Sequence, residues 1–494
     1  MATGNTTTEV RFVDTTIRDG PLSLWANNMR TGQMLAVAED LDRAGFEAIE
    51  TIYEQPKKIV RELREDPWER LRLLGQHYTQ TPLRTILGRF TRFELSPAVL
   101  FEMMVECLAR AGVRQARVSD DWNQPAGWAM RLRLCRAVGM EPILNLIYSL
   151  SPKHTDAYYA ERARQAAALD PYRLCLKDPG GLLTPDRLRT LVPTILANAG
   201  GKYVELHSHC TTGLGPLNAL EVVKLGIRTI NTGIPPLANG AALPNVFNVA
   251  ANLRALGYQP VYDEAAARAV SAKLEAIAER EGFPRGAPVE YDQSWYAHQV
   301  PGGMISNIRH QLQRVGLSHR FQATLEECAR VRQEWGYPIM VTPLAQFVGT
   351  QAAINVIVGE RYKQVSDQTI LYALGHFGGQ EAIEGLDPNV RDLILDRPRA
   401  RELAAWEPPQ PTRAEVRARW GGPGVSDEEL LLRYEVGEAA LAELRAAGPP
   451  RSADALDAGQ PLVTLVAALT RRADRRYVHV QKGDFSLTLQ RTRP

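Results

Sequence analysis

The sequence predicts an α/β fold: a (β/α)₈ TIM barrel followed by a mostly helical C-terminal lobe and a small terminal tail. Short apolar runs alternate with amphipathic stretches over the first ~250 residues. Eight strand–helix units in sequence indicate parallel strands closed into a barrel. After about residue 265 the strand pattern gives way to helical patterns. A doubly wound open sheet is the alternative, but such sheets usually stop at about five or six strands.

The eight expected strands are the apolar runs at 10–19, 46–52, 83–90, 114–122, 142–150, 172–178, 203–209 and 227–235. Helical patterns lie between most of them, for example at 34–45, 98–112 and 127–139. Each of these three patterns ends in a glycine, which commonly terminates a helix.

Composition divides the chain into four parts. We expect a catalytic barrel over 1–265, a helical lobe over 266–448, a linker over 449–459 and a docking tail over 460–494. The linker is rich in Ala, Gly, Pro, Ser and Asp, which is typical of flexible connections. The tail contains a helical pattern and then two strand-like runs that meet at Gly483-Asp484.

Charge and cysteine content exclude several classes of protein. The 58 Lys and Arg nearly balance the 56 Asp and Glu, so nothing favours a nucleic-acid or membrane-surface partner. No apolar run approaches the ~20 residues that cross a bilayer. The five cysteines are scattered and contain no CxxC pair. We therefore expect a cytoplasmic protein without a disulfide framework.

Potential metal ligands lie where strands are expected to end. Asp14, Lys177, His207 and His209 fall at the carboxyl ends of strand runs, the face on which barrels carry their active sites. His207 and His209 project to the same face of a strand, which suits a divalent metal, although they could simply be a hydrogen-bonded pair. Lys177 could ligate a cation only after modification such as carbamylation; the alternative is an ion pair with Asp178 or Asp14.

Longer motifs extend this interpretation. DTTIRDGPLSLWANNMR (14–30), LCLKDPGGLLTPDRL (174–188), ELHSHCTTGLG (205–215) and HQVPGGMISNI (298–308) stand in this order. Over roughly residues 10–445 the chain resembles the carboxyltransferase domain shared by pyruvate carboxylase, the oxaloacetate decarboxylase α subunit and transcarboxylase. The resemblance implies a barrel with a helical lobe, a divalent metal (Zn, Mn or Co), and transfer of CO₂ between carboxybiotin and a 2-oxo acid. It also implies a homodimer.

The resemblance assigns roles to individual residues. Matching positions imply Asp14, Lys177, His207 and His209 as metal ligands, with Lys177 carbamylated. The catalytic residues it points to are Arg18, Asp19, Lys177, Arg89 and Cys210. Arg18 and Asp19 could instead be structural. Arg89 stands next to the position of the expected pyruvate-binding arginine, and Cys210 stands where relatives have an aspartate.

Several positions depart from the family pattern: Leu22, Gly88, Ala241 and Gln346 replace an expected glutamine, arginine, threonine and lysine. Because alanine cannot carry a proton, we expect either a non-standard acceptor or a pyruvate-like acid handled by other groups, with Tyr148, His154, Cys210, Arg89 and Asp120 as the candidates. The alternatives are a biotin-independent metal-dependent decarboxylase or lyase of the same superfamily, and a catalytically impaired scaffold of a carboxylase complex.

The tail adds a prediction about partners. Residues 462–491 resemble the N-terminal segment of the carrier protein of acetyl-CoA carboxylase, and the chain contains no Met-Lys-Met biotinylation motif. We expect biotin to arrive on a separate carrier subunit, and residues 460–494 to dock that carrier or the biotin carboxylase. An ordinary hairpin is the alternative.

Overall fold

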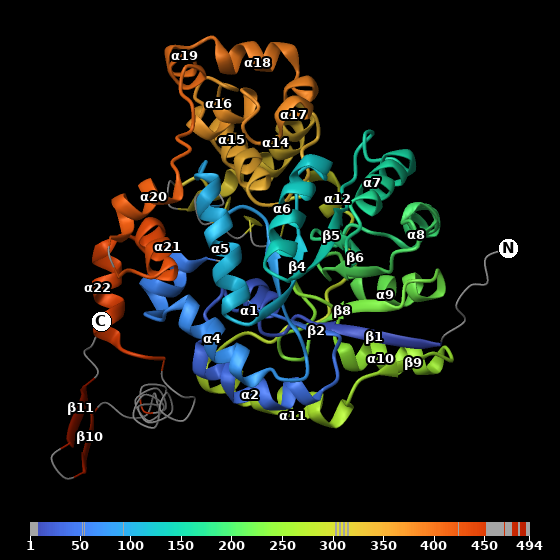
Figure 1. Ribbon diagram of the computed structural model, residues 1–494, viewed down its shortest axis with the longest axis vertical. Coiled ribbons are helices and arrows are strands. Elements are labelled where there is room, and N and C mark those ends of the chain that lie inside the picture. The colour runs from blue at the N-terminus through green and yellow to red at the C-terminus, as the bar shows by residue number, and fades with distance from the viewer. Residues whose placement is uncertain are drawn as a thin grey trace.

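The computed structural model describes residues 8–450, 469, 477–482 and 485–490, except 52, 54, 92, 302–303, 306–307, 310–311, 314–315 and 423. Its central feature is a closed barrel of parallel strands (Figure 1). The strands are β1 (Glu9–Asp14), β2 (Ala48–Glu50), β3 (Leu83–Leu87), β4 (Val113–Val118), β5 (Glu141–Ile147), β6 (Arg173–Asp178), β7 (Val204–Ser208) and β8 (Thr229–Thr232). β1 pairs with both β2 and β8, which closes the barrel and confirms the predicted fold. A short strand, β9 (Gln259–Val261), pairs with the N-terminal half of β1.

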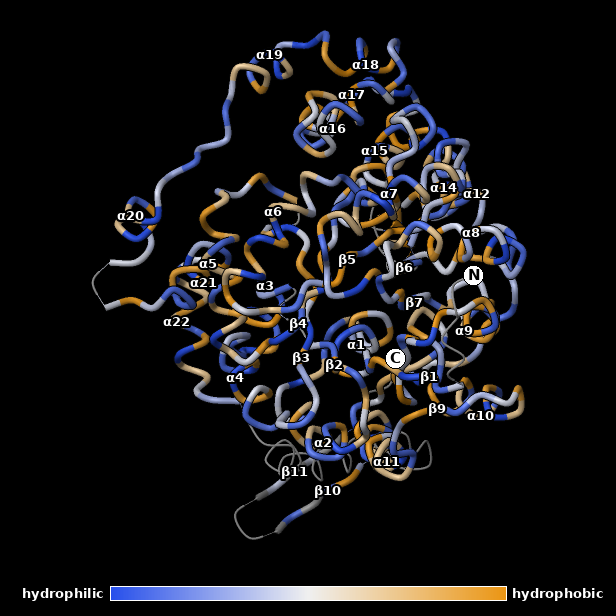
Figure 2. Tube along the Cα trace, turned by 45° about the vertical axis from the view of Figure 1, so that its right-hand side comes forward, coloured by the Kyte–Doolittle hydropathy of each residue, from blue (hydrophilic) through white to orange (hydrophobic). Residues whose placement is uncertain are grey.

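Helices surround the barrel, and their hydrophobic and hydrophilic residues alternate along the chain (Figure 2). They are α1 (Asp19–Leu24), α2 (Thr31–Arg43), α3 (Pro56–Lys58), the π-helical turn η1 (Ile59–Leu63), α4 (Pro67–His77), α5 (Ala98–Arg110), α6 (Pro125–Ala137), α7 (Asp156–Ala168), α8 (Pro185–Asn198), α9 (Gly215–Lys224), α10 (Val246–Ala255) and α11 (Glu264–Glu281). Several begin at a side-chain cap: the Thr184 hydroxyl, for example, accepts from the Arg187 N–H at 3.1 Å.

Charged side chains fill part of the barrel interior. Arg84 Nη1 lies 2.7 Å from Glu205 Oε1, and Arg117 Nη2 lies 3.1 Å from Glu50 Oε2. None of these four side chains is more than 1% exposed. Buried charges persist only when they are paired, because each has lost its hydration. The first pair therefore joins β3 to β7 across the barrel, and the second pair joins β4 to β2.

The helical lobe has its own hydrophobic cluster, which runs from Val300 to Leu403 and includes Trp122 from the loop after β4. Its elements are α12 (Trp295–His298), the 3₁₀ turn η2 (Ser318–Arg320), α14 (Phe321–Glu334), α15 (Leu344–Val358), α16 (Asp367–Ala373), α17 (Gly379–Gly385), α18 (Pro388–Leu395) and α19 (Pro398–Ala404). Figure 1 shows the lobe above one side of the barrel, next to α6 and α7.

The hydrophobic clusters do not divide the chain at 265 and 448. The last helices, α20 (Arg413–Val416), η3 (Arg417–Gly421), α21 (Asp427–Val436) and α22 (Glu438–Ala447), leave the lobe and return to the barrel beside α5 (Figure 1). Leu430, Leu431 and Val436 belong to the barrel's cluster, as do the buried residues of α11. By packing, the lobe is shorter than the predicted 266–448.

Of the tail, the structure describes an antiparallel hairpin, β10 (Tyr477–Lys482) and β11 (Phe485–Gln490), where two strand-like runs are predicted. The predicted linker from residue 451 on and the helical pattern before the hairpin lie outside the described residues, apart from residue 469. Among the helices that are described, none combines the length and apolarity needed to cross a bilayer.

Candidate metal centre at the mouth of the barrel

Three potential ligands meet where β7 and β1 end. The ligand atoms of Asp19, His207 and His209 all lie within 4.8 Å of one another. Asp19 Oδ2 is 3.5 Å from His207 Nε2 and 3.7 Å from His209 Nε2. The side chains of Asp19 and His207 are almost completely buried, and that of His209 is 13% exposed. The cluster thus opens toward solvent only on the His209 side.

Each imidazole is oriented by a hydrogen bond at Nδ1. His209 Nδ1 lies 2.7 Å from the Ala241 carbonyl oxygen, and His207 Nδ1 lies 3.1 Å from Asn231 Oδ1. A carbonyl only accepts, so His209 Nδ1 carries the proton and Nε2 presents a lone pair to the cluster. His207 Nε2 is buried, and among the described residues it has no hydrogen-bond partner within normal geometry, Asp19 Oδ2 lying 3.5 Å away. A lone pair in that position fits a metal ion.

Asp19 is held as a carboxylate. Its Oδ2 accepts a hydrogen bond from Arg18 Nη1, and its Oδ1 accepts one from the Ser23 hydroxyl at 2.8 Å. Burial opposes ionisation, but His209, Arg18 and His207 outweigh burial and hold the pKa of Asp19 well below its usual range. The cluster therefore combines one anionic oxygen with two imidazole nitrogens, a donor set that suits zinc, manganese or cobalt.

Asp14 does not join this cluster, which corrects the ligand predicted from the resemblance. Its carboxylate turns back on its own chain and accepts hydrogen bonds from the Thr16 N–H at 2.9 Å and the Thr16 hydroxyl at 2.5 Å. Burial raises the pKa of Asp14 to about 7. The reason is local: β1 ends at Asp14, and the following turn carries the chain to Asp19 at the start of α1.

Lys177 is close to the cluster in the sheet. In β6 it is the register partner of His207 in β7 and of Ile147 in β5. Register partners on neighbouring parallel strands project to the same side of the sheet. Lys177 is therefore placed next to His207 of the cluster, at the carboxyl end of its strand.

Cys210 and Arg89 lie elsewhere. The Cys210 thiol is 2% exposed in the loop before α9, where burial raises its pKa, and it is not part of the Asp19 cluster. Arg89 Nε donates to Asp121 Oδ2 at 2.8 Å, and its guanidinium lies 5.0 Å from the centre of the Phe377 ring in the lobe. A neutral buried thiol is a poor nucleophile, and Arg89 bridges barrel and lobe.

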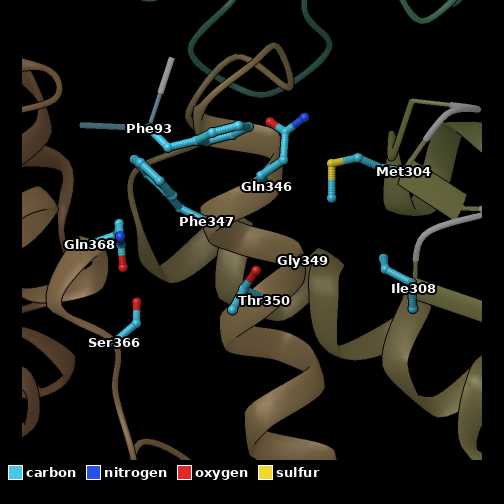
Figure 3. A pocket seen from close by; sticks show the side chains of 9 residues that line it. All are labelled: Phe93, Met304, Ile308, Gln346, Phe347, Gly349, Thr350, Ser366 and Gln368. Atoms are coloured by element: carbon cyan, nitrogen blue, oxygen red, sulfur yellow. The ribbon is translucent and has the colours of Figure 1, made fainter. Parts of the chain in front are cut away.

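A pocket of about 280 Å³ lies in the lobe, and Phe93 is the one lining residue from the barrel part of the chain (Figure 3). Phe93, from the loop after β3, covers one side, and Met304 and Ile308 line the opposite side. Gln346, in the first turn of α15, donates to the Thr342 hydroxyl at 3.0 Å, and its Oε1 is buried and has no hydrogen-bond partner among the described residues. The cavity therefore offers apolar walls, with the amide of Gln346 beside them.

Sequence reasoning missed the residues that orient the ligands. Asn231 is a polar residue within the buried run of β8, and Glu205 precedes His207 by two positions in β7. The period of two along a strand places Glu205 on the same face as His207. The sequence did contain a signal for these residues: each is a polar residue within a strand that is buried on both faces.

Comparisons with known proteins identify the family. Residues 296–437 match the family described as the conserved carboxylase domain. The chain is 32% identical over 433 residues to the B subunit of pyruvate carboxylase from Methanocaldococcus jannaschii, covering 86% of this chain and 76% of that protein. It is 29% identical over 381 residues to the 2-oxoglutarate carboxylase large subunit from Hydrogenobacter thermophilus, covering 75% of this chain and 57% of that protein.

Among solved structures, the fold resembles that of the carboxyl transferase domain from Rhizobium etli pyruvate carboxylase with pyruvate and biocytin. The TM-score is 0.78 at 22% identity, over 90% of this chain and 79% of that one. This match confirms the barrel and the helical lobe as a fold.

Proposed function

The chain belongs to the family of carboxyltransferase subunits of biotin-dependent carboxylases that includes the pyruvate carboxylase B subunit, and on that premise we propose that it moves a carboxyl group between carboxybiotin and a small 2-oxo acid at a metal centre. The single observation that supports the site is the cluster of Asp19, His207 and His209 at the barrel mouth. Two relatives are named for different acceptors, pyruvate and 2-oxoglutarate.

Asp19, His207 and His209 would hold the ion, zinc, manganese or cobalt. A bound divalent ion polarises a carbonyl oxygen and stabilises the negative charge of an enolate. The protein contributes the surroundings: Arg18 and Ser23 fix the carboxylate, and burial excludes water from Asp19 and His207.

Lys177 would complete the ligand set as a carbamate. The Lys177 ammonium first loses one proton; CO₂ then adds to the neutral amine, which forms an N–C bond, releases a second proton and leaves an anionic carbamate with oxygen atoms that can act as ligands. The support is its register beside His207 and its position at the end of β6. Replacing Lys177 by alanine should lower the bound metal per chain, because one ligand is lost.

The cavity beneath Phe93 would receive the biotin ring. Biotin combines an apolar bicyclic body with a ureido group that donates through N–H. Met304 and Ile308 suit the body, and the amide of Gln346, whose Oε1 has no partner in the part of the chain that is described, would turn to accept from the ureido group. Exchange of Gln346 for methionine should raise the KM for the biotinylated carrier and leave metal binding unchanged.

Biotin carboxylase and a separate biotin carrier are the proposed partners, with residues 460–494 as the docking segment. Deletion of 455–494 should abolish co-purification with these two proteins, and unchanged association would refute the assignment. The homodimer also stays a prediction. A light-scattering mass of twice 54.8 kDa would confirm it.

Reconstitution tests the function as a whole. The chain is mixed with biotin carboxylase and biotinylated carrier, and carboxylation that depends on ATP and bicarbonate is assayed over a panel of 2-oxo acids. We expect carboxylation of at least one acid that requires the carrier. Decarboxylation of the acids without carrier would instead support the biotin-independent lyase.

A further inference from the structure

The two histidines of the cluster are oriented in different ways. His209 Nδ1 faces a backbone carbonyl, which can only accept a proton. His207 Nδ1 faces the side-chain amide of Asn231, whose oxygen accepts and whose nitrogen donates. If this amide were turned around, its NH₂ group would face His207. The imidazole would then place its proton on Nε2, where the ligand lone pair is needed.

A buried carboxylate decides which way the amide turns. Asn231 Nδ2 lies 3.4 Å from Glu205 Oε1, and both side chains are at most 1% exposed. Glu205 is ionised against Arg84, whose Nη1 donates to the same oxygen at 2.7 Å. A carboxylate only accepts, so the Asn231 NH₂ group must face Glu205 and the amide oxygen must face His207.

We propose that Glu205 and Asn231 form a relay of positioning residues that fixes the Nδ1–H tautomer of His207 and so prepares its Nε2 as a metal ligand. The relay rests on the proposed metal centre. The relay connects the pair of Arg84 and Glu205 in the barrel interior to the site. Two hydrogen bonds, from Asn231 to Glu205 and between Asn231 and His207, separate this pair from the proposed metal ligand. The relay predicts that the carboxylate of Glu205 affects metal affinity without any contact with the metal.

Exchange of the amide and the carboxylate between the two positions tests the relay. In Glu205→Gln the amide of Asn231 loses its fixed orientation, and in Asn231→Asp two buried carboxylates oppose each other. We expect each substitution to weaken Zn²⁺ binding by about 10–100-fold, the usual effect of losing a group that orients a ligand. The double variant places a carboxylate against His207 and an amide against that carboxylate, and should recover affinity close to that of the wild type.

The measurement is the Zn²⁺ dissociation constant of the full chain by competition with a chromophoric chelator, with thermal unfolding of the metal-free forms beside it. Gln115→Met is the matched control, because Gln115 contacts Arg84 but lies outside the relay. Equal weakening in the control, unchanged affinity in Glu205→Gln, or a folded double variant no tighter than the single variants would overturn the relay. If Asn231→Asp does not fold, the comparison of Zn²⁺ affinity between Glu205→Gln and Gln115→Met decides whether the relay exists. A wild type that binds no Zn²⁺ would instead refute the metal centre itself.

Discussion

Asp14 and Asp19, which stand on either side of one turn, have opposite electrostatic surroundings. Burial raises the pKa of Asp14 to about 7, and its carboxyl group is satisfied by Thr16. Asp19 faces two histidines and Arg18, and its pKa lies well below the usual range. Only Asp19 is therefore available as a fully ionised ligand at neutral pH.

His154 makes stability depend on pH. Burial and the neighbouring cations Arg332, Lys153 and Arg162 lower its pKa from 6.5 to about 3. Above pH 6.5 the group is neutral in both the folded and the unfolded chain. As pH falls below 6.5 only the unfolded chain takes up the proton, so stability is lost. Between pH 6.5 and 5 this costs roughly 1.5–2 kcal/mol, at about 1.4 kcal/mol per pH unit.

Urea unfolding of the wild type and of His154→Gln between pH 7.5 and 5 measures this contribution. The wild type should lose more stability on acidification than the variant. Parallel curves would show that His154 is not a neutral buried group.

The sequence could indicate these residue types but not which of two aspartates reaches the cluster. Both Asp14 and Asp19 lie within the predicted strand 10–19, and the motif resemblance contains both. The choice depends on where β1 ends, which is set by the hydrogen bonds of Thr15 and Thr16 with their neighbours. Such turns depend on contacts with residues far away in the sequence, which the local sequence pattern does not reveal.

At the scale of elements, the loop after β6 approaches the loop after β7 closely. Gly181 has a φ of +65°, and a Cβ there would lie 2.7 Å from the His209 carbonyl oxygen. Gly181→Ala should therefore cost the roughly 1–2 kcal/mol of a left-handed backbone and, in addition, displace His209. We expect lower unfolding free energy together with weaker Zn²⁺ binding.

Gly139→Ala is the control for this substitution. Gly139 also has a positive φ of +75°, but a Cβ there meets nothing within 4 Å. Gly139→Ala should lose only the part of the unfolding free energy that comes from the left-handed backbone, and it should keep its metal affinity. Equal Zn²⁺ affinity in both variants would contradict the close approach at His209.

Strands such as β5 were predictable because they are buried on both faces and consist mostly of apolar residues. The packing of helices was not. α11 and residues 413–447 continue the helical pattern of the lobe, yet their apolar sides belong to the barrel's cluster. Amphipathic periodicity shows which side of a helix is buried but not against which body it packs.

At the scale of the whole molecule, Trp122 joins barrel and lobe. It follows β4 but is 2% exposed within the lobe's hydrophobic cluster, and its Nε1 donates to the Phe377 carbonyl at 2.8 Å. Trp122→Ala should destabilise the docked lobe by about 3–5 kcal/mol. Limited proteolysis should then cut faster between barrel and lobe. Trp406→Ala, at a site 40% exposed, is the control, and equal cleavage of both variants would contradict this role.

The central claim is that Asp19, and not Asp14, ligates a metal together with His207 and His209. The most direct measurement is the metal content per chain of Asp19→Asn and Asp14→Asn, after saturation with Zn²⁺ and gel filtration, by mass spectrometry. Both substitutions keep side-chain size. We predict that Asp19→Asn loses the ion and that Asp14→Asn retains it. Retention by Asp19→Asn, or loss by folded Asp14→Asn alone, would contradict the account.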